Sequence, residues 1–210
     1  MKKLIKTSAN LITLFRIFLV FVMLPFLFII KKDLIIEDQF RNIFISIFVL
    51  ASITDFLDGY IAKKFKQQTI FGKFFDPIAD KLLVIVSFFY IYILSTNDTL
   101  LTKGHNKHIE RLLLSVLLIN IIRDFLVMGV RLIAFEQKTI ITASFLGKLK
   151  TIFTFISIFL MLISKKIETR SSEISMILFN QIFLIINMFL IIWSGIDYII
   201  KNFKFIKNNF

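Results

Sequence analysis

The sequence has no cysteine, and it contains only two histidines, two prolines and six glycines. The lack of cysteine excludes disulfides, thiolate nucleophiles, cysteine-ligated zinc and iron–sulfur clusters. The two histidines, His105 and His108, fall in a polar stretch, where we expect a solvated loop rather than a pair of metal ligands. A bound metal would therefore have to rely on oxygen ligands.

Acidic residues are also scarce, because 14 Asp and Glu stand against 26 Lys and Arg and leave a net charge of +12. Apolar residues are abundant, with 57% of the chain hydrophobic and 27 phenylalanines, which is more than one globular core could bury. A basic, strongly apolar chain is typical of a membrane protein whose excess charge faces anionic lipid. We expect membrane lipid as a partner and no nucleic acid.

Six apolar runs follow one another, each long enough for a helix to cross a bilayer. They are Leu11–Ile30, Asn42–Ala62, Phe74–Leu94, Leu112–Phe135, Ser144–Ser164 and Ile174–Ile200. The first exceeds the apolar core of a signal peptide, ~7–15 residues, and has no small-residue cleavage site, so we expect it to persist as a span. The sequence thus predicts an all-α integral membrane protein with six transmembrane helices in a single domain, 1–210. Residues 1–10 could form an interfacial segment or a frayed basic tail.

The distribution of lysine and arginine predicts the orientation of these spans. Six spans place both termini on the same side of the membrane. With the N-terminus inside, the termini and inner loops hold more lysine and arginine than the outer loops, whose basic residues are nearly balanced by acidic ones. We expect a protein of the cell (inner) membrane with both termini cytoplasmic.

Four aspartates gather where the second span ends and the third begins. Asp55 and Asp58 are three residues apart, and Asp76 and Asp80 are four apart, so each pair shares a helical face. Carboxylates in a membrane span are costly and would repel one another without a neutralising cation or shared protons. Oxygen ligands favour Mg²⁺ or Mn²⁺, and four carboxylates are enough for two ions of the kind used in phosphoryl chemistry. The alternative is that the aspartates cap helix ends beside lysines.

Glycines and a cation extend this pattern at fixed spacing. The stretch reads Asp55-x2-Asp58-Gly59-x2-Ala62-Lys63-x8-Gly72-x3-Asp76-x3-Asp80, and both glycines would allow a ligand or backbone to approach closely. It resembles the signature DxxDGxxAR(x8)GxxxDxxxD of the CDP-alcohol phosphatidyltransferase family. The one departure is Lys63, where the family has arginine. Lysine keeps the charge but lacks the bidentate fork of arginine.

The resemblance implies a six-helix bundle of the CDP-alcohol phosphotransferase type and a role for each matching residue. It implies that Asp55, Asp58 and Asp76 ligate metal, and that Asp80 contacts one ion and serves as the catalytic general base. It implies that the CDP moiety lies against Gly59, is held by Lys63 and has Thr69 nearby, and that Gly72 also belongs to the residues that bind CDP-diacylglycerol. A homodimer is a further implication of the family.

The first span opens with Asn10-Leu11-Ile12-Thr13-x2-Arg16. This resembles the NxLTxxR entry of bacterial members, in which the stretch from Asn to Thr lines the cytidine pocket, so Asn10 and Thr13 are predicted to bind CDP-diacylglycerol. Arg16 falls near the expected depth of the aspartates. Without the resemblance, Asn10 and Thr13 would be interpreted as a helix cap and Arg16 as a snorkelling side chain.

Cations near the fourth and fifth spans are candidates for binding the phosphate of an acceptor. They are Arg123, Arg131, Lys148 and Lys150. Ordinary positive-inside charge is the alternative for Arg131 and the lysines, and structural pairing with Asp124 or Asp80 is the alternative for Arg123.

The segments IIRDFLVMGVRL, TASFLGKLKT and WSGIDY resemble those of the phosphatidylglycerophosphate synthases within the family. Asp124 replaces a usual glutamate, and Thr154 stands where glutamine is common. The resemblance implies that CDP-diacylglycerol and sn-glycerol 3-phosphate are the substrates. Inositol phosphate, phosphatidylglycerol or another alcohol is an alternative acceptor. A cation-coupled transporter or a membrane scaffold would be a different class, but the aspartates lie in one hairpin and no second half repeats them.

Overall fold

The computed structural model describes residues 2–28, 34–65, 70–97, 103–136, 144–167 and 173–207. Side chains near several helix ends, including those of residues 2–10 and 56–74, lie outside the described part. Six α-helices and one short 3-10 helix make up almost all of these ranges. The chain divides into two compact units, Met1–Leu94 and Ser95–Phe210.

The first unit contains α1 (Lys2–Met23), η1 (Leu24–Leu27), α2 (Leu34–Phe65) and most of α3 (Ile70–Asn97). Pro25 lies at the start of η1, where its lack of an N–H is tolerated. The Phe28 N–H donates a hydrogen bond to the carbonyl oxygen of Pro25. Helix α1 packs against α2. Phe44 on α2 stacks on Tyr90 of α3 with ring centroids 3.8 Å apart, and both rings are buried. This stacking joins α2 to α3 in an aromatic core.

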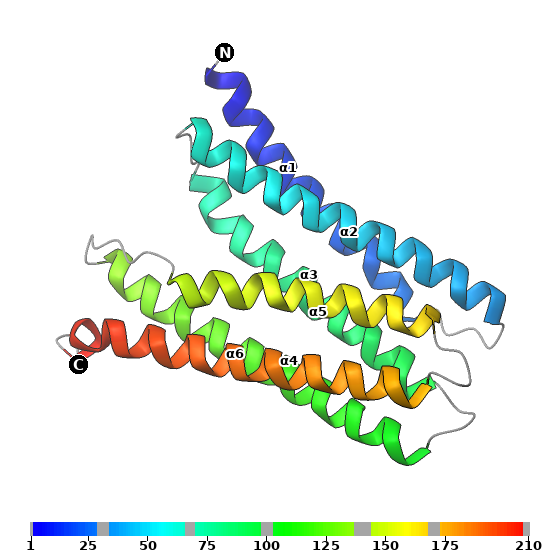
Figure 1. Ribbon diagram of the computed structural model, residues 1–210. Helices are drawn as coiled ribbons and strands as arrows, with labels where there is room; N and C mark the ends of the chain where they lie inside the picture. The colour runs from blue at the N-terminus through cyan, green and yellow to red at the C-terminus, as the bar shows by residue number, and fades with distance from the viewer. Residues whose placement is uncertain are drawn as a thin grey trace. The chain divides into compact units, whose positions relative to one another are not determined.

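The second unit contains α4 (Lys103–Glu136), α5 (Phe145–Ile167) and α6 (Glu173–Lys207), as Figure 1 shows. Helix α6 packs against both α4 and α5. Two buried polar contacts tie α5 to α6: Thr154 donates to Asn187 at 3.0 Å, and Asn180 donates to Ser164 at 2.8 Å. In a lipid environment such hydrogen bonds hold neighbouring helices together.

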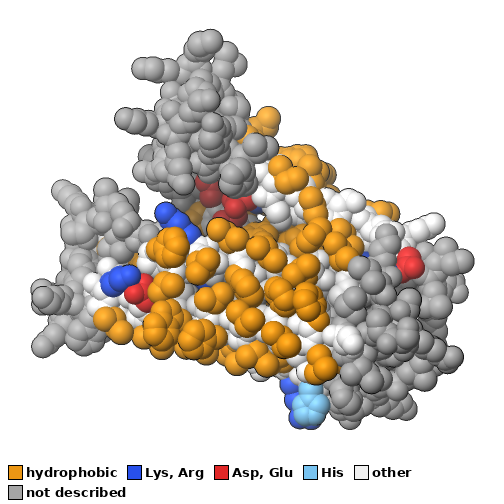
Figure 2. Space-filling model, in the orientation of Figure 1, with side chains coloured by type: hydrophobic (Ala, Val, Ile, Leu, Met, Phe, Trp, Pro, Cys, Tyr) orange, Lys and Arg blue, Asp and Glu red, His pale blue; other side chains and the backbone are white. Residues whose placement is uncertain are grey.

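Large apolar side chains remain exposed along the helices, and Figure 2 shows them covering the face that α5 and α6 present. Among the described residues, four stretches are long and apolar enough to cross a membrane: Phe75–Thr96, His108–Arg131, Phe145–Ser164 and Ile177–Asn202. The first span has a shorter apolar helix, Leu11–Leu27. The prediction of an all-α membrane protein is confirmed.

The six predicted spans overlap the six α-helices. Helices α2, α3, α4 and α6 extend beyond the apolar runs at both ends, whereas α1 ends at Met23 and is followed by η1, before the predicted end of the span at Ile30. The predicted spans 11–30 and 42–62 each end beyond the described side chains. Helix α1 begins at Lys2, so the basic residues 2–10 are helical and continuous with the first span. The single domain over residues 1–210 and the interfacial location of residues 1–10 stay predictions.

Candidate active site

Arg16 is the centre of a charged cluster in the first unit. Its side chain is fully buried on α1, and its Nη1 atom lies 2.8 Å from Asp55 Oδ1 on α2 and 2.7 Å from Asp80 Oδ1 on α3. One guanidinium nitrogen therefore links two of the predicted metal ligands from different helices. The convergence of Asp55 and Asp80, which the spacing of the motif predicted, is present in the structure.

A second contact joins α1 to α3 one helical turn earlier. The Thr13 hydroxyl donates to Asp76 Oδ1 at 2.6 Å. Thr13 pairs with Asp76, and Arg16, three residues later on α1, pairs with Asp80, four residues later on α3. The two helices therefore run in the same direction here, and residues one turn apart on each helix face the other helix. Thr13 is fully buried. Its binding of CDP-diacylglycerol stays a prediction, and in the structure its hydroxyl contacts a predicted metal ligand.

The two carboxylates that meet Arg16 are more accessible than Arg16 itself. The side chains of Asp55 and Asp80 are 35% and 33% exposed, whereas that of Arg16 is 0% exposed. The arginine therefore contacts the carboxylates from the buried side, and each carboxylate keeps an accessible part. Pro77, inside α3 between Asp76 and Asp80, also removes one helical hydrogen bond beside the cluster.

The chemistry of these side chains fits a divalent cation. All donors are carboxylate oxygens, which Mg²⁺ and Mn²⁺ prefer. Asp55, Asp76 and Asp80 all contact side chains of α1, the first and last through the guanidinium of Arg16 and Asp76 through Thr13. No group of three or more histidine, aspartate or glutamate side chains close enough to hold a metal occurs within the described residues.

Several predicted site residues lie outside the described side chains, and their roles stay predictions. Asp58, Gly59 and Lys63 belong to α2, Gly72 belongs to α3 and Asn10 belongs to α1. Thr69 falls between α2 and α3, outside the described residues.

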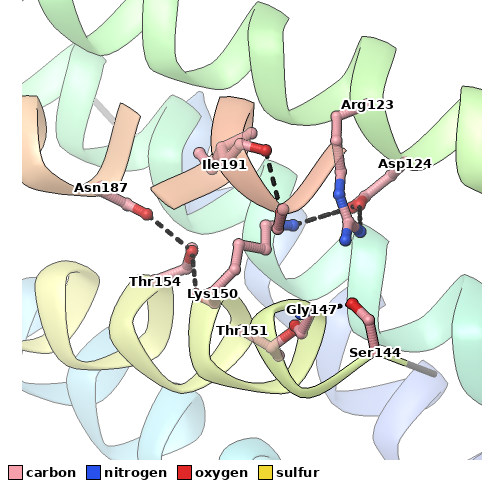
Figure 3. Close-up of polar contacts among 10 residues, drawn as sticks. Arg123, Asp124, Ser144, Gly147, Lys150, Thr151, Thr154, Asn187 and Ile191 are labelled. Carbon is pink, nitrogen blue, oxygen red and sulfur yellow. Dashed lines mark hydrogen bonds and ion pairs between the residues drawn. The ribbon is translucent and has the colours of Figure 1, made fainter. Parts of the chain in front are cut away.

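The second unit contains a separate cluster of charged side chains, in which two cations contact Asp124 on α4 (Figure 3). Arg123 Nη1 donates to Asp124 Oδ1 at 2.9 Å, and Lys150 Nζ on α5 lies 3.2 Å and 3.3 Å from the two carboxylate oxygens. All three side chains are at least 86% buried. Two of the predicted acceptor cations are thus brought together, and the alternative that Arg123 pairs with Asp124 is present in the structure.

Two glycines leave space for the Arg123 side chain. A Cβ atom at Gly147 would lie 3.3 Å from Arg123 Nη2, and one at Gly195 would lie 3.1 Å from Arg123 Cγ. Ser144 precedes α5 and its hydroxyl accepts a hydrogen bond from the Gly147 N–H at 3.1 Å, which is N-capping geometry. The cap and the two glycines together fix where α5 begins and where Arg123 lies.

The other two predicted acceptor cations are not part of this cluster of ion pairs. The guanidinium of Arg131 lies 5.8 Å from the centre of the Tyr198 ring, in a cation–π contact, and Arg131 is exposed. Lys148 is also exposed.

Comparison with known proteins gives the family. The model of the CDP-alcohol phosphatidyltransferase family matches residues 6–193. The chain belongs to the CDP-alcohol phosphatidyltransferase family. These phosphatidyltransferases are in general dependent on a divalent metal, which agrees with the carboxylate chemistry around Arg16.

Among its relatives, this phosphatidyltransferase is similar to proteins named CDP-diacylglycerol–glycerol-3-phosphate 3-phosphatidyltransferase. The protein of Rickettsia typhi is 36% identical over 193 residues, covering 92% of this chain and 95% of the relative. That of Rickettsia prowazekii is 36% identical, with 92% and 93% covered. That of Bacillus subtilis is 32% identical, with 78% and 75% covered.

Some contacts of this phosphatidyltransferase could not be derived from the sequence. The ion pairs of Arg16 with two aspartates were missed, although the sequence placed Arg16 near the depth of the aspartates in the membrane. The pairing of Asp124 with both Arg123 and Lys150 was also missed, because Lys150 follows 26 residues later on another helix. Gly147 and Gly195 lie in segments that carried the resemblance, yet their contact with Arg123 depends on helix packing.

Proposed function

We propose that this chain transfers the phosphatidyl group of CDP-diacylglycerol to sn-glycerol 3-phosphate, giving phosphatidylglycerol phosphate and CMP. The observation that carries the chemistry is the convergence of Asp55 and Asp80 on Arg16, because it joins two aspartates of the family motif from separate helices. The names of relatives that align with nearly the whole chain support the choice of acceptor.

In this reaction Asp80 acts as the general base. Its carboxylate accepts the proton of the primary hydroxyl of glycerol 3-phosphate, and the resulting alkoxide attacks the β-phosphorus of CDP-diacylglycerol. The bond between that phosphorus and the bridging oxygen breaks, and CMP leaves with the electron pair. Arg16 holds Asp80 through an ion pair at 2.7 Å, and Thr13 holds Asp76 through its hydroxyl. Positioning of this kind is a large part of catalysis in phosphoryl transfer.

Divalent cations belong to this proposal. We assign Asp55, Asp58, Asp76 and Asp80 as the ligands of two ions, Mg²⁺ or Mn²⁺. When bound, the ions neutralise the charge of the diphosphate and of the leaving CMP. The contacts of Asp55, Asp76 and Asp80 with α1, which gather three of these carboxyl groups around one helix, support the assignment.

The two substrates use different charged groups. For the donor, we assign the residues of the motif and of the first span: Asn10, Thr13, Gly59, Lys63, Thr69 and Gly72. For the acceptor phosphate, we assign Arg123, Arg131, Lys148 and Lys150. The cluster of Arg123, Lys150 and Asp124 supports this assignment, because it brings two of these cations together from different helices.

The location follows from the chemistry and from the charge of the loops. We place the chain in the cell (inner) membrane with both termini and the active site on the cytoplasmic side, where glycerol 3-phosphate is dissolved and anionic lipid attracts basic loops. The acyl chains of the donor stay in the bilayer. We also propose that the chain is a single membrane domain and works as a homodimer.

The test is CMP release by the full chain purified in detergent with Mg²⁺ and CDP-diacylglycerol. Each acceptor is added singly and then in competition: glycerol 3-phosphate, inositol phosphate, phosphatidylglycerol and glycerol. We expect CMP release to depend on glycerol 3-phosphate and the lipid product to carry two phosphates. Exclusive use of another acceptor would contradict the acceptor assignment, and no CMP release with any acceptor would contradict the transfer reaction.

A further inference from the structure

We propose that Arg16 is an internal counter-cation, which stabilises the acidic site when no metal is bound and lowers the affinity of the site for a divalent cation. The inference rests on the proposed function in one respect, namely that a divalent cation binds at these carboxylates. It assigns to Arg16 a positioning role through Asp55 and Asp80 rather than a contact with substrate.

The first observation is the sharing of one nitrogen by two acids. Nη1 of Arg16 lies within 2.8 Å of an oxygen of Asp55 and of an oxygen of Asp80. Two carboxylates this close to the same atom are also close to each other, and they would repel without a cation between them. The guanidinium supplies that positive charge from within the protein, so the two acidic helices can approach before any metal binds.

The second observation concerns the other two nitrogen atoms of the Arg16 guanidinium. Arg16 Nε and Nη2 are buried and have no hydrogen-bond partner in the part of the chain that the structure describes. A buried arginine retained mainly to link helices is expected to have most of its donors paired. Arg16 instead has both its ion pairs at a single nitrogen, which is the atom directed at the acids. Its charge at that point, rather than a network of hydrogen bonds, explains its burial.

The third observation is the direction of approach. Arg16 is 0% exposed, whereas the Asp55 and Asp80 side chains are about a third exposed. A cation from solution reaches the carboxylates on their accessible side, and Arg16 contacts them from the buried side. The cation does not need to displace the arginine. Both positive charges then act on the same carboxylates in a partly buried environment, where their mutual repulsion is large.

The test compares the full-length wild-type protein with Arg16→Gln in detergent. Thermal unfolding is followed in EDTA and in Mn²⁺, and Mn²⁺ affinity is measured by electron paramagnetic resonance titration. We expect Arg16→Gln to have a lower Tm in EDTA, a larger Mn²⁺-induced rise in Tm and a Kd for Mn²⁺ about tenfold lower than wild type, because a like charge near the ion is removed. Arg16→Lys, which keeps the charge, should bind Mn²⁺ with a Kd within about threefold of the wild-type value.

Arg41→Gln is the matched control. Arg41 is also a buried arginine of the first unit, but it pairs with the single carboxylate of Asp38, three residues earlier on α2. It is 14 residues from Asp55, about 21 Å along the helix. We expect its replacement to lower the Tm equally in EDTA and in Mn²⁺ and to leave the Kd for Mn²⁺ unchanged.

Three results would overturn the inference. If the Tm of Arg16→Gln falls below that of wild type by the same amount in EDTA and in Mn²⁺, and the Kd is unchanged, Arg16 is a structural residue only. Weaker Mn²⁺ binding by Arg16→Gln would mean that the arginine organises the metal site instead of opposing the metal. If Arg16→Gln does not fold, Arg16→Lys decides, and a tenfold change in its Kd would show that charge is not the cause.

The wild-type protein separates failure of this inference from failure of the proposed function. Wild type that binds Mn²⁺ and releases CMP keeps the proposed function, whatever Arg16→Gln does. Wild type that neither binds Mn²⁺ nor gains Tm from it would overturn the metal assignment and this inference together.

Discussion

Arg16 Nη1 donates to Asp80 Oδ1 at 2.7 Å, so α1 is joined to α3 at the carboxylate that we assign as the general base. A charge-assisted hydrogen bond of this length orients the carboxylate as well as balancing its charge. The same nitrogen contacts Asp55 at 2.8 Å. Three helices of the first unit therefore meet at one guanidinium, and the first span is part of the acidic site.

Asp80→Asn should abolish turnover without preventing expression. The amide cannot accept a proton from the acceptor hydroxyl, and loss of a general base lowers rates by roughly 10²–10⁴-fold. CMP release by purified protein is the measurement. Asp197→Asn is the control, because Asp197 pairs with Lys201 one turn away on α6 and should tolerate the change. An active Asp80→Asn enzyme would contradict the base assignment.

Thr13→Val should lower both stability and activity. It removes the hydroxyl that donates to Asp76 at 2.6 Å but keeps the volume of the buried side chain. Loss of a hydrogen bond to a charged group costs about 1.5–3 kcal/mol. Thermal unfolding and CMP release measure the two effects, and Thr13→Ser should restore both. Wild-type activity in the valine variant would show that orientation of Asp76 by Thr13 is unimportant.

Gly195→Ala should raise the KM for glycerol 3-phosphate more than the KM for CDP-diacylglycerol. The added Cβ would lie 3.1 Å from Arg123 Cγ and would displace the side chain that we assign to the acceptor phosphate. Gly129→Ala on α4 is the control, because a Cβ there has nothing within 4 Å. Equal changes in both KM values would contradict a role of Arg123 in acceptor binding.

Removal of divalent metal with EDTA should stop CMP release, and addition of Mg²⁺ or Mn²⁺ should restore it. The reason is that the diphosphate and the carboxylates would otherwise repel each other at the reaction centre. The measurement is initial rate against free metal concentration. Full activity in EDTA would contradict the assignment of Asp55, Asp58, Asp76 and Asp80 as metal ligands.

Thr154→Val should destabilise the second unit while sparing the chemistry. The Thr154 hydroxyl donates to Asn187 at 3.0 Å between α5 and α6, and its removal would leave the buried Asn187 oxygen without that donor. We expect a loss of about 1 kcal/mol of stability. Thermal unfolding measures it, and Thr154→Ser should retain most of the contact. A lower kcat with an unchanged Tm would contradict this prediction.

Much of the fold and part of the site could be predicted from the sequence. Apolar length alone placed the six helices, because a bilayer requires about twenty apolar residues per span. The spacing of Asp55 and Asp58, and that of Asp76 and Asp80, predicted a shared helical face for each pair. The helix bounds were less accurate, since polar residues at the ends, such as those from Lys2 in α1, continue the helix beyond the apolar run.

The sequence by itself determined the membrane class, the six helices and the family motif, because these depend on composition and on spacing along one chain. Only the tertiary structure decided which charges meet. Arg16 is 39 residues before Asp55 and 64 before Asp80, and Lys150 is 26 residues after Asp124. Helical periodicity relates residues three or four apart, whereas contacts between helices depend on how the helices pack. The partner of a buried charge is therefore fixed by packing.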